Sequence, residues 1–157
     1  MRIETEPKLD YKDVLIRPKR STLRSRKEVS LKRSYRTVNS QLHWTGVPIM
    51  AANMDGVGTF DMHKALSVHH LFTCMVKHYS DEQWLLQKDA ILPDLLAIST
   101  GTGQADWEQI QRLVPRLGLR WICIDIANGY SEHFVEFIKR ARAHFPNLGI
   151  IAGNVVT

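Results

Sequence analysis

Short apolar runs recur along most of the chain at a nearly constant interval. They begin near Val47, Leu71, Leu95, Trp121 and Leu148, which lie 24, 24, 26 and 27 residues apart. Runs this short are typical of strands that are covered on both faces of a sheet. Segments with helical periodicity fill the intervals, so the chain from residue 47 onward predicts alternating strands and helices.

Helix start signals support this alternation. Ser80 and Gln83 have the spacing of a capping box, and Asp106 opens a stretch whose apolar residues share one face. After the turn residues Asn128-Gly129, Ser131 is placed to cap the last helix. Residues 60–68 predict a shorter helix.

Regular strand and helix alternation predicts a parallel sheet joined by right-handed crossovers. Two architectures satisfy it. Five units form a complete flavodoxin-like doubly wound domain, or they are the first five units of an eight-unit barrel, which usually needs about 250 residues. The pattern alone leaves both open.

Residues 1–46 do not share this rhythm and predict a separate basic N-terminal arm or hairpin, with the β/α region spanning 47–157. The net charge is +7 for residues 1–40 and −2 for residues 41–157. The basic cluster from Arg17 to Lys27 has no interleaved aromatic residues and no nucleic-acid-binding motif, so we expect no nucleic-acid partner. The phosphates of a small nucleotide are an alternative partner for it.

Composition predicts one soluble globular body. The chain has 157 residues, of which 44% are hydrophobic, and no apolar run approaches the roughly 20 residues of a membrane span. With no signal-peptide pattern either, we expect a cytoplasmic protein without a membrane partner. Cys74 and Cys123 lie inside apolar runs and are expected to be buried thiols. The histidines lack the spacing of a metal site, so no metal ligand is predicted.

Polar residues stand where the predicted strands end, and they carry the functional signal. They are Asn53, Asp55, Lys77, Ser99, Thr100, Asp125 and Asn154. In either architecture the C-terminal ends of parallel strands gather at one rim, which is where ligands bind. A lysine, two aspartates and several amides suit a polar, anionic ligand such as a nucleotide. Cys123 is mid-strand, where a thiolate would be desolvated and inert.

Several strings closely resemble the IMP dehydrogenase/GMP reductase family, from about Leu9 to Thr157. They are KDVLIRPKRSTLRSR (12–26), GVPIMAANMDGVGTF (46–60), KHYS (77–80), STGT (99–102), CIDIANGYSEHFVEF (123–137) and AGNVVT (152–157). The last helix string is similar to the reductases of this family. The chain between Lys77 and Ser99 also leaves no room for the regulatory domains that the dehydrogenases usually insert.

The resemblance implies a TIM (β/α)8 barrel of which about five units are present. It implies an oxidoreductase of purine metabolism that performs NADPH-dependent reductive deamination of GMP to IMP and ammonia, in a cytoplasmic homotetramer. In the family a cysteine attacks the purine and the cofactor supplies hydride. That cysteine, its partner threonine and the loop for a monovalent cation such as K⁺ would lie beyond Thr157, so no catalytic residue is assigned here.

By motif match, six residues would contact NADPH: Ser25, Arg26, Lys77, Asp125, Ile126 and Ala127. The same resemblance makes Asn53 and Met54 neighbours of the purine. Two positions depart from the family pattern. Gly56 replaces a threonine in MDTVGTF, and Val76 replaces the first histidine of HKHYS.

Five units of a barrel would leave open sheet edges, so we expect this chain to be a fragment that is inactive by itself. Two alternatives come from other classes of protein. One is a non-catalytic partner that pairs with a full-length reductase or a complementary half. The other is a small nucleotide-binding module on a doubly wound sheet.

Overall fold

The computed structural model describes residue 3 and residues 5–155, so the last two residues of the AGNVVT string lie outside the described part. The chain divides into two compact units, 1–30 and 31–157. In the first unit the described elements are two single-turn 3₁₀ helices, η1 (Tyr11–Asp13) and η2 (Arg26–Glu28). Ser25 caps η2, because its hydroxyl accepts a hydrogen bond from the Lys27 N–H at 3.2 Å. The predicted boundary after residue 46 stays a prediction.

The second unit opens with an antiparallel hairpin of β1 (Arg33–Arg36) and β2 (His43–Gly46). A five-stranded parallel sheet follows, and its strands confirm the five predicted runs. They are β3 (Met50–Ala51), β4 (Phe72–Cys74), β5 (Leu96–Thr100), β6 (Trp121–Ile124) and β7 (Gly149–Ala152). The register pairs Cys74 with Ala97 and Ser99 with Cys123.

Four helices connect these strands: α1 (Phe60–Ser67), α2 (Asp81–Leu86), α3 (Gln104–Leu117) and α4 (Glu132–His144). Two of the predicted helix starts are present, whereas α3 starts at Gln104, two residues before Asp106, whose Oδ2 accepts from the Gly103 N–H at 3.0 Å. Ser80 and Gln83 form both bonds of a capping box, and the Ser131 hydroxyl accepts from the Phe134 N–H at 3.3 Å. Gly118 follows the last residue of α3 and caps the helix, and its φ of +63° is the left-handed conformation that glycine adopts without strain.

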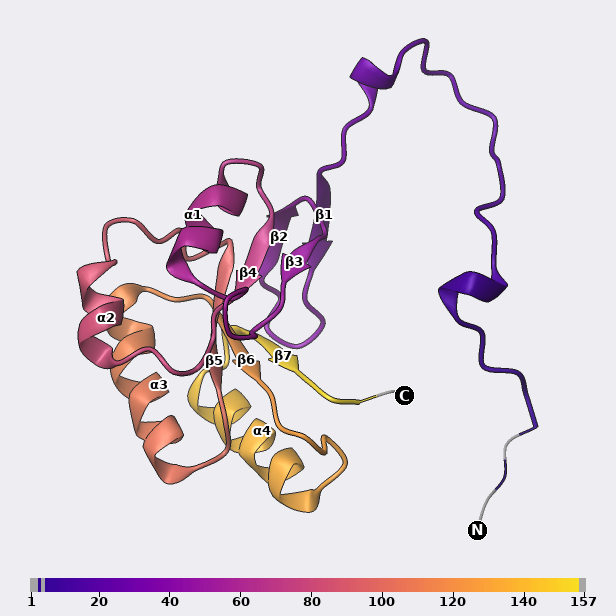
Figure 1. The fold of residues 1–157 in the computed structure, drawn as a ribbon. Coiled ribbons are helices and arrows are strands. Elements are labelled where there is room, and N and C mark those ends of the chain that lie inside the picture. The colour runs from indigo at the N-terminus through magenta and orange to yellow at the C-terminus, as the bar shows by residue number, and fades with distance from the viewer. Residues whose placement is uncertain (1–2, 4, 156–157) are drawn as a thin grey trace. The chain divides into compact units, whose positions relative to one another are not determined.

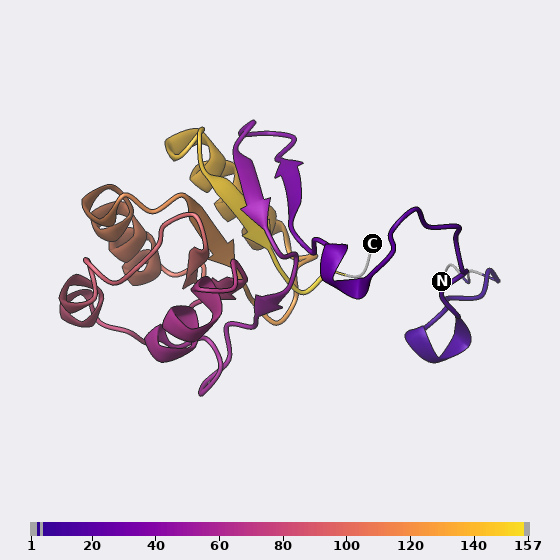
Figure 2. The ribbon, with the colours of Figure 1, turned by 90° about the horizontal axis from the view of Figure 1, so that it is seen from above.

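The strand order decides between the two predicted architectures. The order β3-β4-β5-β6-β7 follows the chain, whereas a doubly wound sheet reverses direction and places helices on both faces. Here the four helices form an outer arc and the strands lie inside it (Figures 1 and 2). This is the winding of a (β/α)8 barrel, and the described part is a partial barrel.

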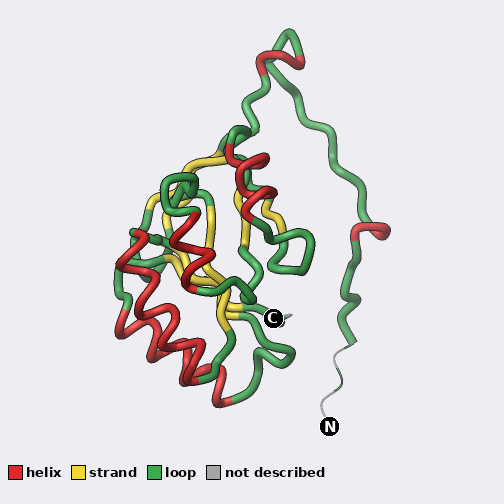
Figure 3. Tube along the Cα trace, turned by 60° about the vertical axis from the view of Figure 1, so that its left-hand side comes forward, coloured by secondary structure: helices red, strands yellow, loops and turns green. Residues whose placement is uncertain are grey.

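Alternate residues of each strand face two different hydrophobic clusters. The helix-facing cluster joins the sheet to the helices through residues such as Leu96, Ile98, Ile122 and Ile124. The inner cluster lies on the opposite face and contains Trp44, Phe72, Cys74, Leu95, Ala97 and Cys123. Trp44 comes from the hairpin and meets Phe72 edge to face at 6.2 Å between ring centroids. Figure 3 shows the yellow strands lying against the red helices.

Candidate functional site

A polar cleft of about 380 Å³ lies at the C-terminal ends of the strands. Its lining residues are Asn53, Met54, Asp55, Val76, Lys77, His78, Ser99, Thr100 and Asp125. Six of the seven polar residues predicted at the strand ends are among them, and Asn154 is not. The residues that the family resemblance assigned to the cofactor or the purine and that line the cleft are Asn53, Met54, Lys77 and Asp125. They follow β3, β4 and β6, so the sheet brings together residues that are up to 72 positions apart in the sequence.

Asp125 is held at the edge of this cleft by three neighbouring elements. Its Oδ2 accepts a hydrogen bond from Asn53 Nδ2 at 2.9 Å, and its N–H donates to the Thr100 carbonyl at 3.1 Å. Gly153, just after β7, lies against the other carboxylate oxygen, because a Cβ placed there would be 2.8 Å from Asp125 Oδ1. The carboxylate is therefore half-buried, oriented on one oxygen by an amide and given room on the other by a residue without a side chain.

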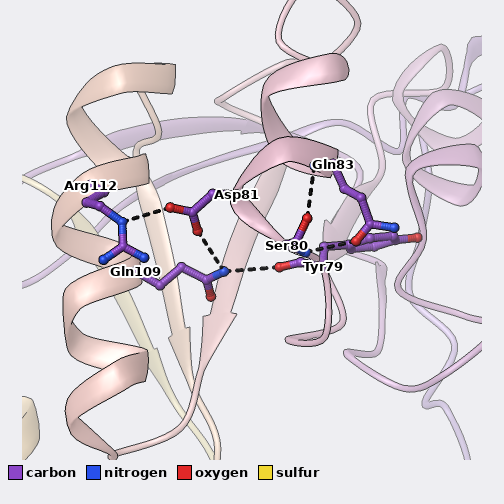
Figure 4. Close-up of polar contacts among 6 residues, drawn as sticks. All are labelled: Tyr79, Ser80, Asp81, Gln83, Gln109 and Arg112. Carbon is purple, nitrogen blue, oxygen red and sulfur yellow. Dashed lines mark hydrogen bonds and ion pairs between the residues drawn. The ribbon is translucent and has the colours of Figure 1, made fainter.

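Lys77 is exposed at the end of β4. The residues that follow it, from Tyr79 onward, are fixed to α3 by a polar clamp (Figure 4). Gln109 Nε2 donates to the Tyr79 carbonyl at 3.0 Å and to Asp81 Oδ1 at 3.1 Å. Arg112 Nε donates to Asp81 Oδ2 at 2.8 Å. That hydrogen bond is the main reason why the pKa of Asp81 is lowered from its ordinary value. The clamp restrains the backbone that carries Lys77 and leaves its ammonium group in solvent.

The loop after β3 closes one side of the cleft by close backbone approach. The Val76 N–H donates to the Gly58 carbonyl at 2.8 Å, and a Cβ on Gly58 would be 2.3 Å from the Cys74 carbonyl oxygen. Gly56, one of the two departures from the family pattern, has a φ of +74° that a β-branched residue resists. Across the opening, His78 Nε2 lies 3.8 Å from Asp55 Oδ1, and both side chains are largely exposed.

The other predicted cofactor contacts lie elsewhere. Ile126 is half-buried and packs against the helix-facing cluster, while Ala127 is exposed and its carbonyl accepts from Asn154 Nδ2 at 3.3 Å. Neither lines the cleft. Ser25 and Arg26 belong to the 1–30 unit. The roles predicted for these four residues remain predictions.

Sequence reasoning missed the close approach of Gly153 and the pairing of Asn53 with Asp125. Gly153 stands directly after a strand in the AGN sequence, and a glycine at that position is a signal for backbone approach to a neighbouring group. Nothing in the sequence marks Asn53 as the partner of Asp125, since the bond depends on strands β3 and β6 facing the same space.

The two cysteines lie in the inner cluster, both buried. Cys74 Sγ is 3.6 Å from Met50 Sδ. The hydrogen bond with Cys123, and then burial, raises the pKa of the Cys74 thiol, so this thiol stays protonated. Within the described residues, no three His, Cys, Asp or Glu side chains are grouped as they would be around a metal ion. No helix in that part has the length and apolar character needed to cross a membrane.

The cleft can bind a polar ligand that carries both negative charge and hydrogen-bond donors. An exposed ammonium group suits a phosphate or another anion, whereas an oriented carboxylate accepts from hydroxyl or amide N–H groups. A nucleotide offers both kinds of group. The residues present therefore fit a nucleotide at this rim.

Comparison with known proteins identifies the family that the chain resembles along almost its whole length. Residues 8–157 match the IMP dehydrogenase / GMP reductase domain. GMP reductase of Caenorhabditis elegans is 53% identical over 160 residues, which cover 99% of this chain and 45% of the relative. GMP reductase of Klebsiella pneumoniae is 53% identical over 161 residues, and human GMP reductase 2 is 52% identical over 158. The chain spans about half the length of the curated relatives it matches.

The fold has a solved counterpart. The crystal structure of inosine 5′-monophosphate dehydrogenase from Legionella pneumophila superposes with a TM-score of 0.76 at 21% sequence identity. The match covers 93% of this chain and 44% of that one. It supports the partial (β/α)8 barrel derived from the strand order. With the domain match over residues 8–157, it follows that the chain belongs to the IMP dehydrogenase/GMP reductase family.

Proposed function

We propose that this chain forms the cofactor-binding part of a GMP reductase, which converts GMP to IMP and ammonia with NADPH. The observation that carries the proposal is the cleft that brings Lys77, Asn53 and Asp125 to one rim. Identity above 50% to GMP reductases along almost the whole chain supports the choice of reaction. In this proposal the enzyme is cytoplasmic and assembles as a homotetramer.

Each residue has a defined part in this proposal. Lys77 supplies positive charge to the anionic ligand, and Asp125 accepts hydrogen bonds from the nicotinamide end. NADPH, when bound, supplies the hydride of the reduction. Ser25, Arg26, Ile126 and Ala127 complete the cofactor contacts, and Asn53 and Met54 lie near the purine.

The nucleophile that the reaction needs is assigned to neither cysteine of this chain. Cys74 and Cys123 are 4% and 5% exposed and sit among apolar side chains, where attack on a purine carbon has no access. We place the catalytic cysteine, its threonine and any K⁺ site in the half of the relatives that this chain does not span. The 157-residue chain is accordingly expected to bind NADPH without oxidising it in the presence of GMP.

A fluorescence titration with NADPH tests the cofactor assignment. Lys77→Met should weaken binding by about 10- to 100-fold, since a hydrogen bond to a charged group is worth roughly 1.5–3 kcal/mol. Lys64→Met, at an exposed position on α1 outside the cleft, is the matched control and should bind like the unchanged chain. Equal affinity of the two variants would contradict the assignment, and GMP-dependent oxidation of NADPH by this chain would contradict the placement of the nucleophile.

The inner face favours a second role, pairing with a complementary β/α segment. A cavity of about 250 Å³ there is lined almost wholly by apolar atoms of residues including Trp44, Phe72, Trp121 and Ile151. Among the described strands, β3 and β7 each have one neighbour in the sheet. A complementary half or a full-length reductase chain would cover both features, which co-purification followed by cross-linking would detect. The sequential strand order removes the doubly wound sheet on which a separate nucleotide-binding module would depend.

A further inference from the structure

The Ser99 hydroxyl is buried at the floor of the polar cleft without a hydrogen-bond partner. Ser99 is 2% exposed, and its Oγ makes no hydrogen bond to any described group. It lies on the inner face of β5, in register with Cys123 and two residues after Ala97. The pKa of the neighbouring Cys123 thiol is lowered first by its hydrogen bond with Cys74 and to a smaller extent by the Ser99 hydroxyl. A thiol sulfur is only a weak acceptor, so it does not satisfy that hydroxyl.

A serine at this place is costly unless something binds its hydroxyl. A buried hydroxyl without a partner destabilises the folded chain, whereas alanine would fill the same narrow space without that cost. Alanine is in fact what the same face of β5 carries at residue 97. A bound ligand that forms a hydrogen bond with the Ser99 hydroxyl would therefore explain why an unpaired hydroxyl lines a cleft of this size.

The charge around Ser99 restricts what that partner is. Asp125 shares the cleft, and one of its oxygens is already occupied by Asn53. A phosphate on the floor would bring negative charge close to this carboxylate, which is unfavourable. A neutral group that donates to Asp125 and exchanges a hydrogen bond with a hydroxyl fits better, and a primary carboxamide has both N–H donors and a carbonyl acceptor.

We propose that the Ser99 hydroxyl binds the carboxamide of the nicotinamide ring and contributes to selection of that group. The inference rests on the proposed function, since it places the nicotinamide end of NADPH in this cleft. It adds a specificity contact on β5 to the predicted contacts, which come from the arm, from β4 and from β6. Asp125 accepts one hydrogen of the amide, and the Ser99 hydroxyl oxygen accepts the other.

A comparison of two cofactors tests the proposal on the intact 157-residue chain. The first is NADPH, and the second is the reduced 3-acetylpyridine analogue, which keeps the ring carbonyl and lacks the amide N–H groups. Ser99→Ala should raise the Kd for NADPH by about 3- to 10-fold, the size of one hydrogen bond, and leave the Kd for the analogue nearly unchanged. Ser67→Ala, which removes a serine hydroxyl outside the cleft, should change neither value.

The outcomes separate this inference from the function on which it rests. Binding of NADPH with the same Kd for Ser99→Ala would overturn the inference and leave the function standing. An equal loss of affinity for both cofactors would also overturn it, because the partner would then be a group that both cofactors carry, such as the ring carbonyl, the ribose or the phosphates. Failure of the unchanged chain to bind NADPH would defeat the proposed function and this contact together.

A second measurement needs no ligand. If the Ser99 hydroxyl gains its hydrogen-bond partner only when a ligand binds, Ser99→Ala should keep or raise the Tm of the free chain, since the substitution removes an unsatisfied buried group. A fall in Tm of about 3 °C or more, roughly 1 kcal/mol for a chain of this size, would show that the hydroxyl has a partner inside the protein. That result would overturn the proposal whatever the binding data give.

Discussion

The two faces of the parallel sheet are built from side chains of different size. On the helix-facing side, Leu96, Ile98, Ile122 and Ile124 are large, at most 1% exposed and packed against the helices. On the inner side the same two strands, β5 and β6, present Ala97, Ser99 and Cys123, which are small, and the one large side chain that these described strands place there is Trp121 at the start of β6. The apolar cavity and the polar cleft both lie on this inner side.

This difference means that one face of the sheet can contribute most of the stability while the other face is left for binding. Large aliphatic side chains fill the space under the helices and bury most of the apolar area there. Small side chains on the other face leave room for a ligand and for further chain. Substitutions on the two faces should therefore change the free energy of unfolding by different amounts. The variants below test this difference, from the largest expected effect to the smallest.

The largest effect is expected from Ile122→Ala, on the helix-facing side. Ile122 is fully buried, and removing its side chain leaves a cavity that the helices cannot fill, which costs about 2–5 kcal/mol. Ile151→Ala, on the half-buried inner side, should cost about 1 kcal/mol, because Ile151 already borders a cavity. Urea unfolding of the two variants measures both values. Equal losses would mean that the inner face is as tightly packed as the other.

A pH effect is expected from His63, which α1 buries to 1% exposure. Its Nε2 accepts from the Leu92 N–H at 3.0 Å, and burial lowers the pKa of the ring, so the folded chain favours neutral histidine. The contribution of neutral His63 to the free energy of unfolding is therefore fully present above the ordinary pKa of about 6.5. It decreases as the pH drops below that value, because the histidine of the unfolded chain takes up a proton first. One such proton accounts for at most about 1.4 kcal/mol per pH unit.

Thermal unfolding at pH 7.5 and at pH 5.5 measures this dependence. His63→Gln keeps an acceptor for the Leu92 N–H and removes the titration, so its Tm should fall less between the two pH values than that of the unchanged chain. His133→Gln, at an exposed position on α4, serves as the control and should behave like the unchanged chain. If the His63 variant loses as much Tm as the control, another group carries the pH dependence.

The smallest effect is expected at Thr73, the counterpart of Ser99 on the helix-facing side. Thr73 is fully buried and its Oγ1 has no hydrogen-bond partner among the described groups. Thr73→Val removes the hydroxyl with little change in shape and should stabilise the chain by about 1 kcal/mol. Calorimetry would show a higher Tm. A lower Tm would indicate a bound water molecule that pairs with the Thr73 hydroxyl. The helix-facing side would then contain water and would not be held together by apolar contacts alone.

Local chemistry explains why much of the fold could be predicted. The apolar runs gave the five strands, and Ser80 and Ser131 marked helix starts because caps act within three residues along the chain. The gathering of Lys77 and Asp125 at one rim also followed from strand direction alone. These inferences need only the sequence and the geometry of a parallel sheet.

The remaining features depend on contacts that are distant in sequence. Strand alternation fits either architecture, so only the observed order separated them. The bond between Asn53 and Asp125 and the approach of Gly153 to the same carboxylate arise from sheet curvature, which no local pattern records. Whether the Ile126 side chain faces the cleft or the helices depends on where β6 ends. If the strand ended one residue later or earlier, the side chain would face the opposite side of the sheet.

The four tryptophans divide evenly between the two clusters. Trp84 and Trp107 belong to the helix-facing cluster, whereas Trp44 belongs to the inner cluster and Trp121 packs against it. Indole emission shifts to longer wavelength when solvent reaches the ring and to shorter wavelength when solvent is displaced from the ring. The chain therefore carries two pairs of optical reporters, so that filling of the inner cavity and loosening of the helical layer would give separate signals in the fluorescence of the unlabelled protein.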